Sequence, residues 1–210
     1  MNIARIYYPY DFKNNEEVIL NKKINHYLTH VLRIKHNSQI QLFNGKNIIF
    51  PAQILSLDYK KIQIKILTVK EQNSESPLYL HLGQVISCSE KMKFSLQKAV
   101  ELGVNVITPL FSKRCKVKLT NLEMIKKKKH WKKIVIAACE QCGINYIPKI
   151  RDLMTLESWC KETTSSFKIH FCQNEKTIKI KMLPFNIKRL RILIGPESGI
   201  SQDEKKYGKS

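Results

Sequence analysis

An apolar strand that runs straight into a glycine-rich loop and a helix start most constrains what this chain can fold into. The apolar run Ile192–Ile194 is followed directly by Gly195 and Pro196. Ser201 and Glu204 have the spacing of a capping box, so we predict a helix that begins at Ser201. In open α/β sheets, ligands bind beyond the carboxyl ends of strands, and glycine lets the backbone approach them closely. A plain strand–turn–helix connection has the same pattern, so the residues alone leave both interpretations open.

Strands alternate with amphipathic helices from Leu78 onward. Gly103 and Gly143 each follow a helical pattern, at the position where glycine commonly ends a helix. Such alternation predicts a mostly parallel α/β sheet. The predicted strands are Tyr79–Ser87, Val104–Leu110, Phe167–Cys172 and Leu190–Ile194, and the predicted helices are Glu90–Leu102 and Leu122–Gln141.

The first third of the chain has short strands and one small helix, predicted at Ile24–Leu32. Asn44-Gly45 predicts a tight hairpin, because these residues accept the positive φ that such turns need. Pro51 has no N–H to donate, which places its strand at an edge or a bulge. The polar stretch Glu71–Pro77 is a predicted linker. The strands, which together suggest a small barrel, are Ile3–Tyr8, Gln39–Phe43, Ile48–Leu57 and Lys61–Val69.

The formal net charge of +20 makes nucleic acid the first partner to consider, because phosphate neutralisation drives such binding. The chain is rich in Lys, Ile and Asn throughout, so a purely compositional origin of the charge is the alternative. The run Lys126–Lys129 is either a solvated helix face or an RNA-facing stripe. We find no signal peptide and no apolar stretch near the ~18 residues of a membrane span, so we expect a cytoplasmic protein with no membrane partner.

Cysteine spacing argues against a metal site. Cys139 and Cys142 form a C-x-x-C pair, but zinc would need a second pair at suitable spacing. Cys160 and Cys172 do not supply one. Cys139 and Cys142 also continue an apolar helical pattern, so we expect free thiols, no bound metal and a reducing compartment.

Two segments, Gln97–Gly103 and Ala138–Gly143, place Glu and Gln close to a helix end beside a glycine. The helix dipole mildly disfavours a carboxylate there, which points to specific hydrogen bonding. An ordinary solvated helix face is the alternative for both.

Many further segments fall into one recognisable order: Arg5–Tyr7, His30–Arg33, Gln41–Gly45, Ser76-Pro77, His81–Val85, Glu90–Phe94, Gln97–Gly103, Ile107–Ser112, Trp131–Ile134, Ala137–Gly143 and Leu193–Gly199. Together they resemble the RsmE family, SPOUT-class methyltransferases that methylate N3 of a uridine in 16S rRNA. The resemblance runs along nearly the whole chain. So many segments in order are highly specific, whereas any one alone would be weak.

The resemblance implies an α/β protein in two parts. Residues 1–72 are expected to form a PUA-like β-barrel that grips RNA. Residues 73–210 are expected to form a SPOUT domain with a trefoil knot, which binds S-adenosylmethionine and forms a homodimer. The implied reaction methylates N3 of a specific uridine in 16S rRNA of the assembled small ribosomal subunit. It is a direct methyl transfer, so positioning and removal of the N3 proton should matter most.

The resemblance also carries individual residues across. Arg5, His30 and Arg33 stand where the family's N-terminal domain is basic, and are the predicted RNA contacts. Cys172–Glu175 stands at the place of a second cofactor-side loop. Glu197 is the candidate catalytic base, or equally a loop anchor. The residues that match the family's first cofactor-binding segment are Leu193, Ile194, Gly195, Pro196, Glu197 and Gly199.

Three departures from the family pattern matter. Ser198 replaces the second glycine of the family's GPEGG motif. Ile144 replaces the arginine that usually follows the glycine of the family's Glu-Gln-x-Gly motif. The family continues beyond Tyr207–Ser210 by on the order of 30 residues, about one strand–helix unit, so we expect a truncated methyltransferase domain. The competing hypotheses are an active methyltransferase, a remnant that binds rRNA without the cofactor, and an unrelated basic structural protein.

Overall fold

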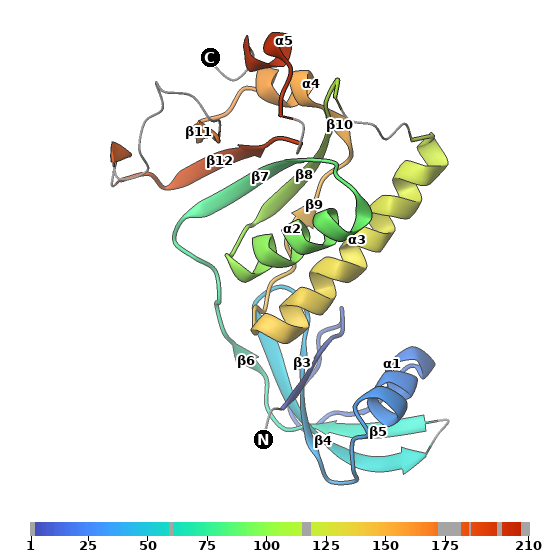
Figure 1. Cartoon of the computed structure of the whole chain (residues 1–210). Helices are drawn as coiled ribbons and strands as arrows, with labels where there is room; N and C mark the ends of the chain where they lie inside the picture. The colour runs from blue at the N-terminus through green and yellow to red at the C-terminus, as the bar shows by residue number, and fades with distance from the viewer. Residues whose placement is uncertain are drawn as a thin grey trace. The chain divides into compact units, whose positions relative to one another are not determined.

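The computed structural model describes residues 3–58, 61–114, 119–171, 182–184, 186–196 and 199–206 (Figure 1). The chain divides into two compact units. Unit 1 comprises Met1–Glu75 and Cys139–Ile147, and unit 2 comprises Ser76–Ala138 and Pro148–Ser210. Unit 1 thus includes a segment that the sequence pattern grouped with the α/β half.

Unit 1 is a six-stranded sheet around one apolar core. Its strands run in the order β1-β3-β4-β5-β2, with β6 also paired to β4. All pairs are antiparallel except β1 with β3. Alternate residues of the strands point inward, which buries side chains such as Ile40, Phe50 and Ile64. The strands are β1 Ala4–Tyr7, β2 Glu17–Ile19, β3 Gln39–Phe43, β4 Ile48–Asp58, β5 Lys61–Ile66 and β6 Lys70–Glu71, and the helices are α1 Lys22–His26 and the π-helix η1 Tyr27–Val31.

The hairpin between β3 and β4 confirms the prediction from Asn44-Gly45. Gly45 has a φ of +80°, and the Asn44 side chain accepts the Lys46 N–H at 2.8 Å. Pro51 corrects another expectation, since β4 is a central strand and its bulge lies between Ile54 and Ser56. Pro51 instead lies just before the β4 residues that pair with β5, and its carbonyl accepts the Leu67 N–H at 2.8 Å.

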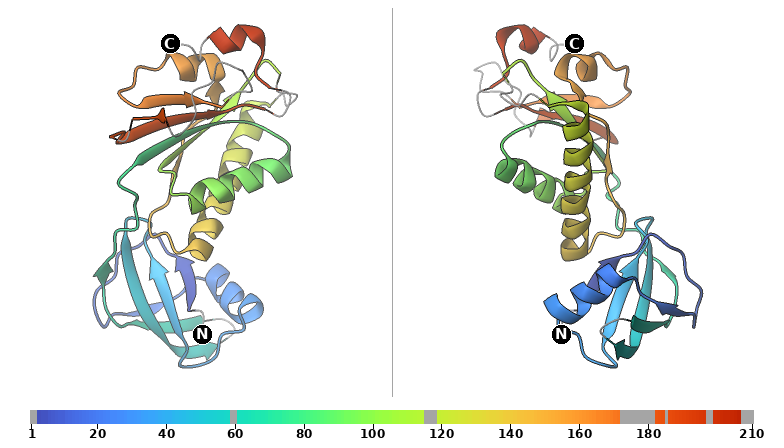
Figure 2. Two further views of the ribbon diagram at one scale, coloured as in Figure 1. Left: turned by 60° about the vertical axis from the view of Figure 1, so that its left-hand side comes forward. Right: turned by 90° about the vertical axis from the view of Figure 1, so that its right-hand side faces the viewer.

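Unit 2 is a parallel sheet, as predicted, and helices cover both of its faces. Its strand order is β10-β8-β7-β12-β11, with β9 also paired to β8, and every pair is parallel. Two helices, α2 and α3, cover one face and the short α4 covers the other (Figures 1 and 2). The strands are β7 Tyr79–Val85, β8 Val106–Phe111, β9 Lys149–Ile150, β10 Met154–Thr155, β11 Phe167–His170 and β12 Arg189–Ile194, and the helices are α2 Ser89–Glu101, α3 Asn121–Cys142, α4 Leu156–Lys161 and α5 Gln202–Lys205.

The α4 face of the sheet has its own small core. Leu156 and Trp159 of α4 pack with Val85, Leu193 and Ile200. Gly83 on β7 makes room for the indole, because a Cβ atom there would lie 2.7 Å from the Trp159 ring. Among the described residues, no helix is both long and apolar enough to cross a membrane.

Replacing Gly83 with alanine should destabilise unit 2. The added methyl group must displace the Trp159 ring, and overpacking of this kind typically costs about 1–3 kcal/mol. Urea unfolding followed by circular dichroism measures the loss. The double variant Gly83→Ala/Trp159→Phe should recover part of it, because the smaller ring leaves space for the methyl group. A double variant no more stable than the single one would contradict this packing.

Candidate active site and RNA-binding surface

The candidate cofactor loop emerges from the carboxyl end of β12, between two parallel neighbours. Leu193 lies opposite Gly83 of β7 and His170 of β11. Its side chain is buried in the α4-side core, so the strand end presents main-chain groups rather than this side chain. Ile194, by contrast, is partly exposed. The sequence therefore predicted correctly that a strand delivers this loop to a sheet edge.

Two glycines shape the described part of the loop. Gly199 has a φ of +70°, and its N–H donates to the Pro196 carbonyl at 2.9 Å. Gly195 does not have a positive φ, but a Cβ atom there would lie 2.9 Å from Ile200 Cγ1. Its glycine requirement thus comes from close packing. Glu197 and Ser198 lie outside the described residues, as does the predicted second loop, Cys172–Glu175.

The predicted capping box is present and does more than begin a helix. The Ser201 hydroxyl donates to the Glu204 carboxylate at 2.7 Å, and α5 starts at the next residue. The same carboxylate accepts the Lys113 backbone N–H at 2.8 Å and the Ser112 hydroxyl at 3.3 Å. Glu204 therefore joins the start of α5 to the residues that follow β8. No local pattern indicated this second role.

Glu204 is held in the charged state by these donors. Only 5% of the residue is exposed. Burial raises the pKa of its carboxyl group, but hydrogen bonds from Lys113, Ser201 and Ser112 outweigh burial, so the net pKa is lowered.

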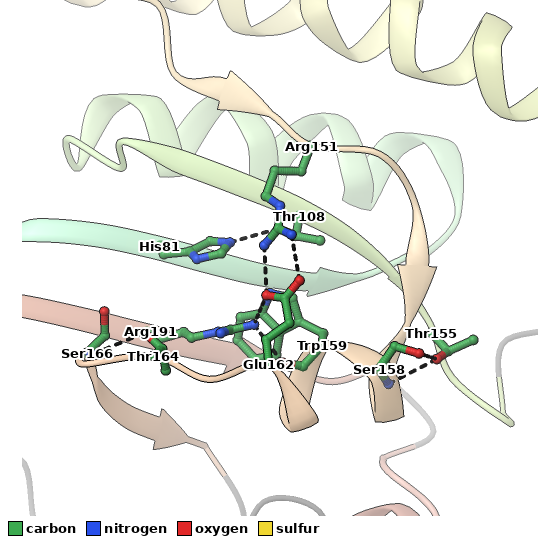
Figure 3. Close-up of polar contacts among 10 residues, drawn as sticks. All are labelled: His81, Thr108, Arg151, Thr155, Ser158, Trp159, Glu162, Thr164, Ser166 and Arg191. Atoms are coloured by element: carbon green, nitrogen blue, oxygen red, sulfur yellow. Dashed lines mark hydrogen bonds and ion pairs between the residues drawn. The ribbon is translucent and has the colours of Figure 1, made fainter.

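A polar cluster lies under α4 on the same face of the sheet (Figure 3). Arg191 of β12 is 4% exposed, and its guanidinium lies 3.8 Å from the Trp159 ring centroid. It donates to the Trp159 carbonyl at 2.6 Å and to Glu162 at 2.8 Å. Arg151 binds both oxygens of the same carboxylate, at 2.9 and 2.5 Å. Glu162 thus bridges two arginines, and the Arg151 hydrogen bond is the main cause of its lowered pKa.

His81 completes this cluster as a neutral side chain. Its Nε2 lies 2.7 Å from the Thr108 hydroxyl. Burial lowers the pKa of His81 to about 4, and repulsion from Arg191 and Arg151 adds to the effect. None of these residues was singled out as a site residue from the sequence. A cavity beside them reaches the candidate cofactor segment at one end, and is lined by Trp159, Cys160, Lys168, Ile169, His170, Arg191 and Leu193.

The predicted RNA contacts in unit 1 fall into two environments. His30 and Arg33 are both exposed and lie at the end of η1. Arg5 on β1 is partly buried instead, and its guanidinium donates to Asn145 Oδ1 at 2.8 Å and to the Ile144 carbonyl. The guanidinium also lies over the Phe43 ring. Arg5 therefore already has partners within unit 1.

The Glu140 side chain makes the specific hydrogen bond that its position suggested. Its Oε1 accepts the Tyr7 backbone N–H at 2.9 Å. Cys139 is buried, and burial raises the pKa of its thiol to about 12, whereas Cys142 is exposed. Within the described residues, no group of three or more His, Cys, Asp or Glu side chains is arranged to hold a metal ion.

Family models match both halves of the chain. An RNA methyltransferase domain matches residues 74–210, and an RNA methyltransferase PUA domain matches residues 20–67. Unit 2 is a parallel sheet in which strand β12 leads into a glycine-rich loop. Together with these matches, this fold defines the class: an RNA methyltransferase with an N-terminal PUA domain.

Similarity to curated relatives identifies the particular family. The ribosomal RNA small subunit methyltransferase E of Buchnera aphidicola subsp. Schizaphis graminum is 46% identical over 200 residues, which is 95% of this chain and 81% of that protein. The enzyme of the same name from Buchnera aphidicola subsp. Acyrthosiphon pisum is 40% identical, over 96% of this chain and 80% of that protein. The chain belongs to the ribosomal RNA small subunit methyltransferase E family, which removes the hypothesis of an unrelated basic protein.

Solved structures agree with the fold. A putative methyltransferase from Legionella pneumophila, in complex with S-adenosylmethionine, has a TM-score of 0.92 at 36% identity, over 99% of this chain and 86% of that one. The methyltransferase E of Neisseria gonorrhoeae, bound to S-adenosylmethionine, has a TM-score of 0.92 at 32% identity, over 99% and 85%. The expected PUA-like domain and SPOUT methyltransferase fold are thereby confirmed.

Neutralising Glu204 should loosen the start of α5. Glu204→Gln keeps an acceptor oxygen but loses the charge, so we expect the unfolding free energy at about pH 7 to fall by about 1–3 kcal/mol. The folded pKa lies below the ordinary 4.5, so the carboxylate's contribution is complete above that value and is lost as the pH falls through the folded pKa. Urea unfolding at about pH 7 and about pH 4 should show the difference between the two proteins shrink in acid.

Asp203→Asn provides the matched control for this experiment. Asp203 is adjacent and pairs with Lys113, but its side chain is 66% exposed, so its loss should change stability little. Equal losses for the two variants, or a difference that does not depend on pH, would contradict the anchoring role of Glu204.

Proposed function

We propose that this chain methylates N3 of a specific uridine in 16S rRNA of the assembled small ribosomal subunit, with S-adenosylmethionine as methyl donor. The observation that carries the proposal is the 46% identity to a small-subunit rRNA methyltransferase over 95% of the chain. A loop of suitable form at the carboxyl end of β12 supports it. Because its substrate is ribosomal RNA, we place the protein in the cytoplasm.

The cofactor would be held by Leu193, Ile194, Gly195, Pro196, Glu197 and Gly199. The described part of this segment fits a ligand held by main-chain groups, because Leu193 turns its side chain into the core and Gly195 has none. Gly199 and Ile200 anchor the far end of the segment. When bound, S-adenosylmethionine supplies an electrophilic methyl group on its sulfonium.

The protein's own contribution to the reaction is then positioning and proton removal. A uridine N3–H must lose its proton, and Glu197 is our candidate acceptor within the cofactor loop. Fixing both ends of the loop would keep the two reactants aligned, which would lower the entropic part of the activation barrier. No step requires a metal ion.

Unit 1 would bind the RNA through Arg5, His30 and Arg33. The protein would act as a homodimer. His30 and Arg33 are exposed and available to phosphates or bases. The Arg5 guanidinium is hydrogen-bonded to Asn145, so Arg5 would contact RNA while it keeps that bond. The net charge of +20 favours such binding and predicts a steep dependence on salt.

The direct test uses small ribosomal subunits from cells that lack this modification. They are incubated with the protein and methyl-labelled S-adenosylmethionine, and the rRNA is digested and analysed by mass spectrometry. We expect one labelled nucleoside, N3-methyluridine, from 16S rRNA. Label on another base or in another RNA would contradict the proposed substrate. Cofactor binding without label, or rRNA binding without cofactor binding, would contradict the proposed activity.

Gly195→Val should weaken S-adenosylmethionine binding by at least about tenfold, or ~1.4 kcal/mol. A branched side chain would block the close approach of the backbone to the cofactor and press on Ile200. Isothermal titration calorimetry measures the affinity, and a melting curve checks folding. The double variant Gly195→Val/Ile200→Ala relieves the internal contact alone, so it should still bind weakly. Normal affinity in the single variant would remove this residue from the site.

A further inference from the structure

An exposed segment of unit 1 has a backbone form that helices seldom adopt. After α1, the chain continues as the π-helix η1, and the Leu32 N–H donates to the Tyr27 carbonyl five residues earlier at 3.0 Å. Arg33 follows with a φ of +48°, a left-handed conformation that is unfavourable for a residue other than glycine. Single π turns and strained residues are both found frequently at functional sites.

Two buried side chains fix this segment to the unit. Leu28 is fully buried in the core, and Asn25 is buried one turn before it. The Ile34 N–H also donates to the Leu28 carbonyl at 3.0 Å. The strained backbone therefore belongs to an anchored part of the fold, and the neighbouring side chains are directed outward.

The outward side chains form a surface rich in rings, which we name the π-turn surface: His26, Tyr27, His30, Val31 and Arg33. The imidazoles of His26 and His30 are stacked, with ring centroids 4.4 Å apart and an angle of 25° between the planes. The Thr29 hydroxyl lies 2.7 Å from His30 Nδ1, which orients that ring. Val31 is 61% exposed, and Tyr27 is exposed as well.

The charged residues of the segment that carries this surface all have one sign. Residues 21–38 include Lys22, Lys23, Arg33 and Lys35, and no aspartate or glutamate. Flat exposed rings beside cations match an unpaired nucleotide, whose base offers a face for stacking and whose phosphates need positive charge. An A-form duplex hides its base faces, so rings of this kind add little to its binding.

We propose that the π-turn surface binds an unpaired nucleotide of the RNA, with its base stacked on the His26–His30 pair and Arg33 on a flanking phosphate. The proposal rests on the proposed function, because it assigns a particular part of unit 1 to the rRNA substrate. It adds that this unit recognises a single-stranded feature rather than a helix.

The test measures binding of the whole chain to two labelled RNAs by fluorescence anisotropy. One is an unstructured oligonucleotide, and the other is a blunt duplex with the same number of phosphates. We expect tighter binding of the single strand. His30→Ala should weaken that binding by about tenfold, in line with stacking at roughly 1–3 kcal/mol per base, and should leave duplex binding unchanged. His30→Phe should retain most of the affinity, because it keeps a ring without the imidazole.

Charge variants separate stacking from phosphate contact. Arg33→Ala should reduce the slope of log affinity against log salt by about one, whereas His30→Ala should leave the slope unchanged. Lys46→Ala is the matched control, since it removes an exposed cation from the β3–β4 hairpin of the same unit. It should affect single-strand binding less than Arg33→Ala does. Circular dichroism melts verify that each variant is folded.

Three results would overturn the proposal. They are equal affinity of the wild-type chain for the two RNAs, unchanged single-strand binding in His30→Ala, and an equal loss in His30→Phe and His30→Ala. Any of these leaves the proposed methylation reaction standing if the chain still methylates small subunits. A wild-type chain that binds neither RNA nor small subunits would overturn both proposals.

Discussion

The parallel pairing of β12 with β7 and β11 is the constraint on which the rest of unit 2 depends. Its register places Arg191 opposite His81 and Leu193 opposite Gly83. A slip by one residue would turn Arg191 to the other face of the sheet, away from Glu162, and would leave its charge without this partner. The Arg151–Glu162–Arg191 bridge therefore specifies one register, whatever its net contribution to stability. That register fixes where the glycine-rich loop leaves the sheet.

The loop that follows is held at its far end by two different interactions. Ile200 is buried in the α4-side core, and the Glu204 carboxylate joins Ser201 to the backbone after β8. Unit 2 thus uses buried, partnered charges to hold a segment in place. In unit 1, the charges beside the exposed rings of η1 face solvent, where they can meet phosphate. The contrast follows the two tasks that we propose, alignment of a small cofactor and capture of a large anion.

Local patterns predicted most of the elements, because the spacing of apolar residues and the glycines that end helices can be recognised from neighbouring residues. The strand at 190–194, the helix ends at Gly103 and Gly143, and the capping box at Ser201 all follow this rule. The short helix α4 was not predicted, because six residues are too few to show a helical spacing of apolar residues. Arg5, Glu162 and Glu204 depend on partners 11 to 140 residues away, which no local pattern can reveal. The family resemblance supplied the candidate cofactor segment but not these anchoring contacts.

Amide hydrogen exchange tests most directly whether the fold holds the loop's two ends in place before any cofactor binds. The amides of Arg191–Leu193 and of Glu204 are compared in the chain alone and with saturating S-adenosylmethionine. Our account predicts strong, nearly equal protection of these amides in both states, with changes confined to residues between Gly195 and Gly199. Rapid exchange along β12 or at Glu204 that becomes slow only with cofactor would contradict it, because the ligand would then be organising the strand rather than the strand placing the loop.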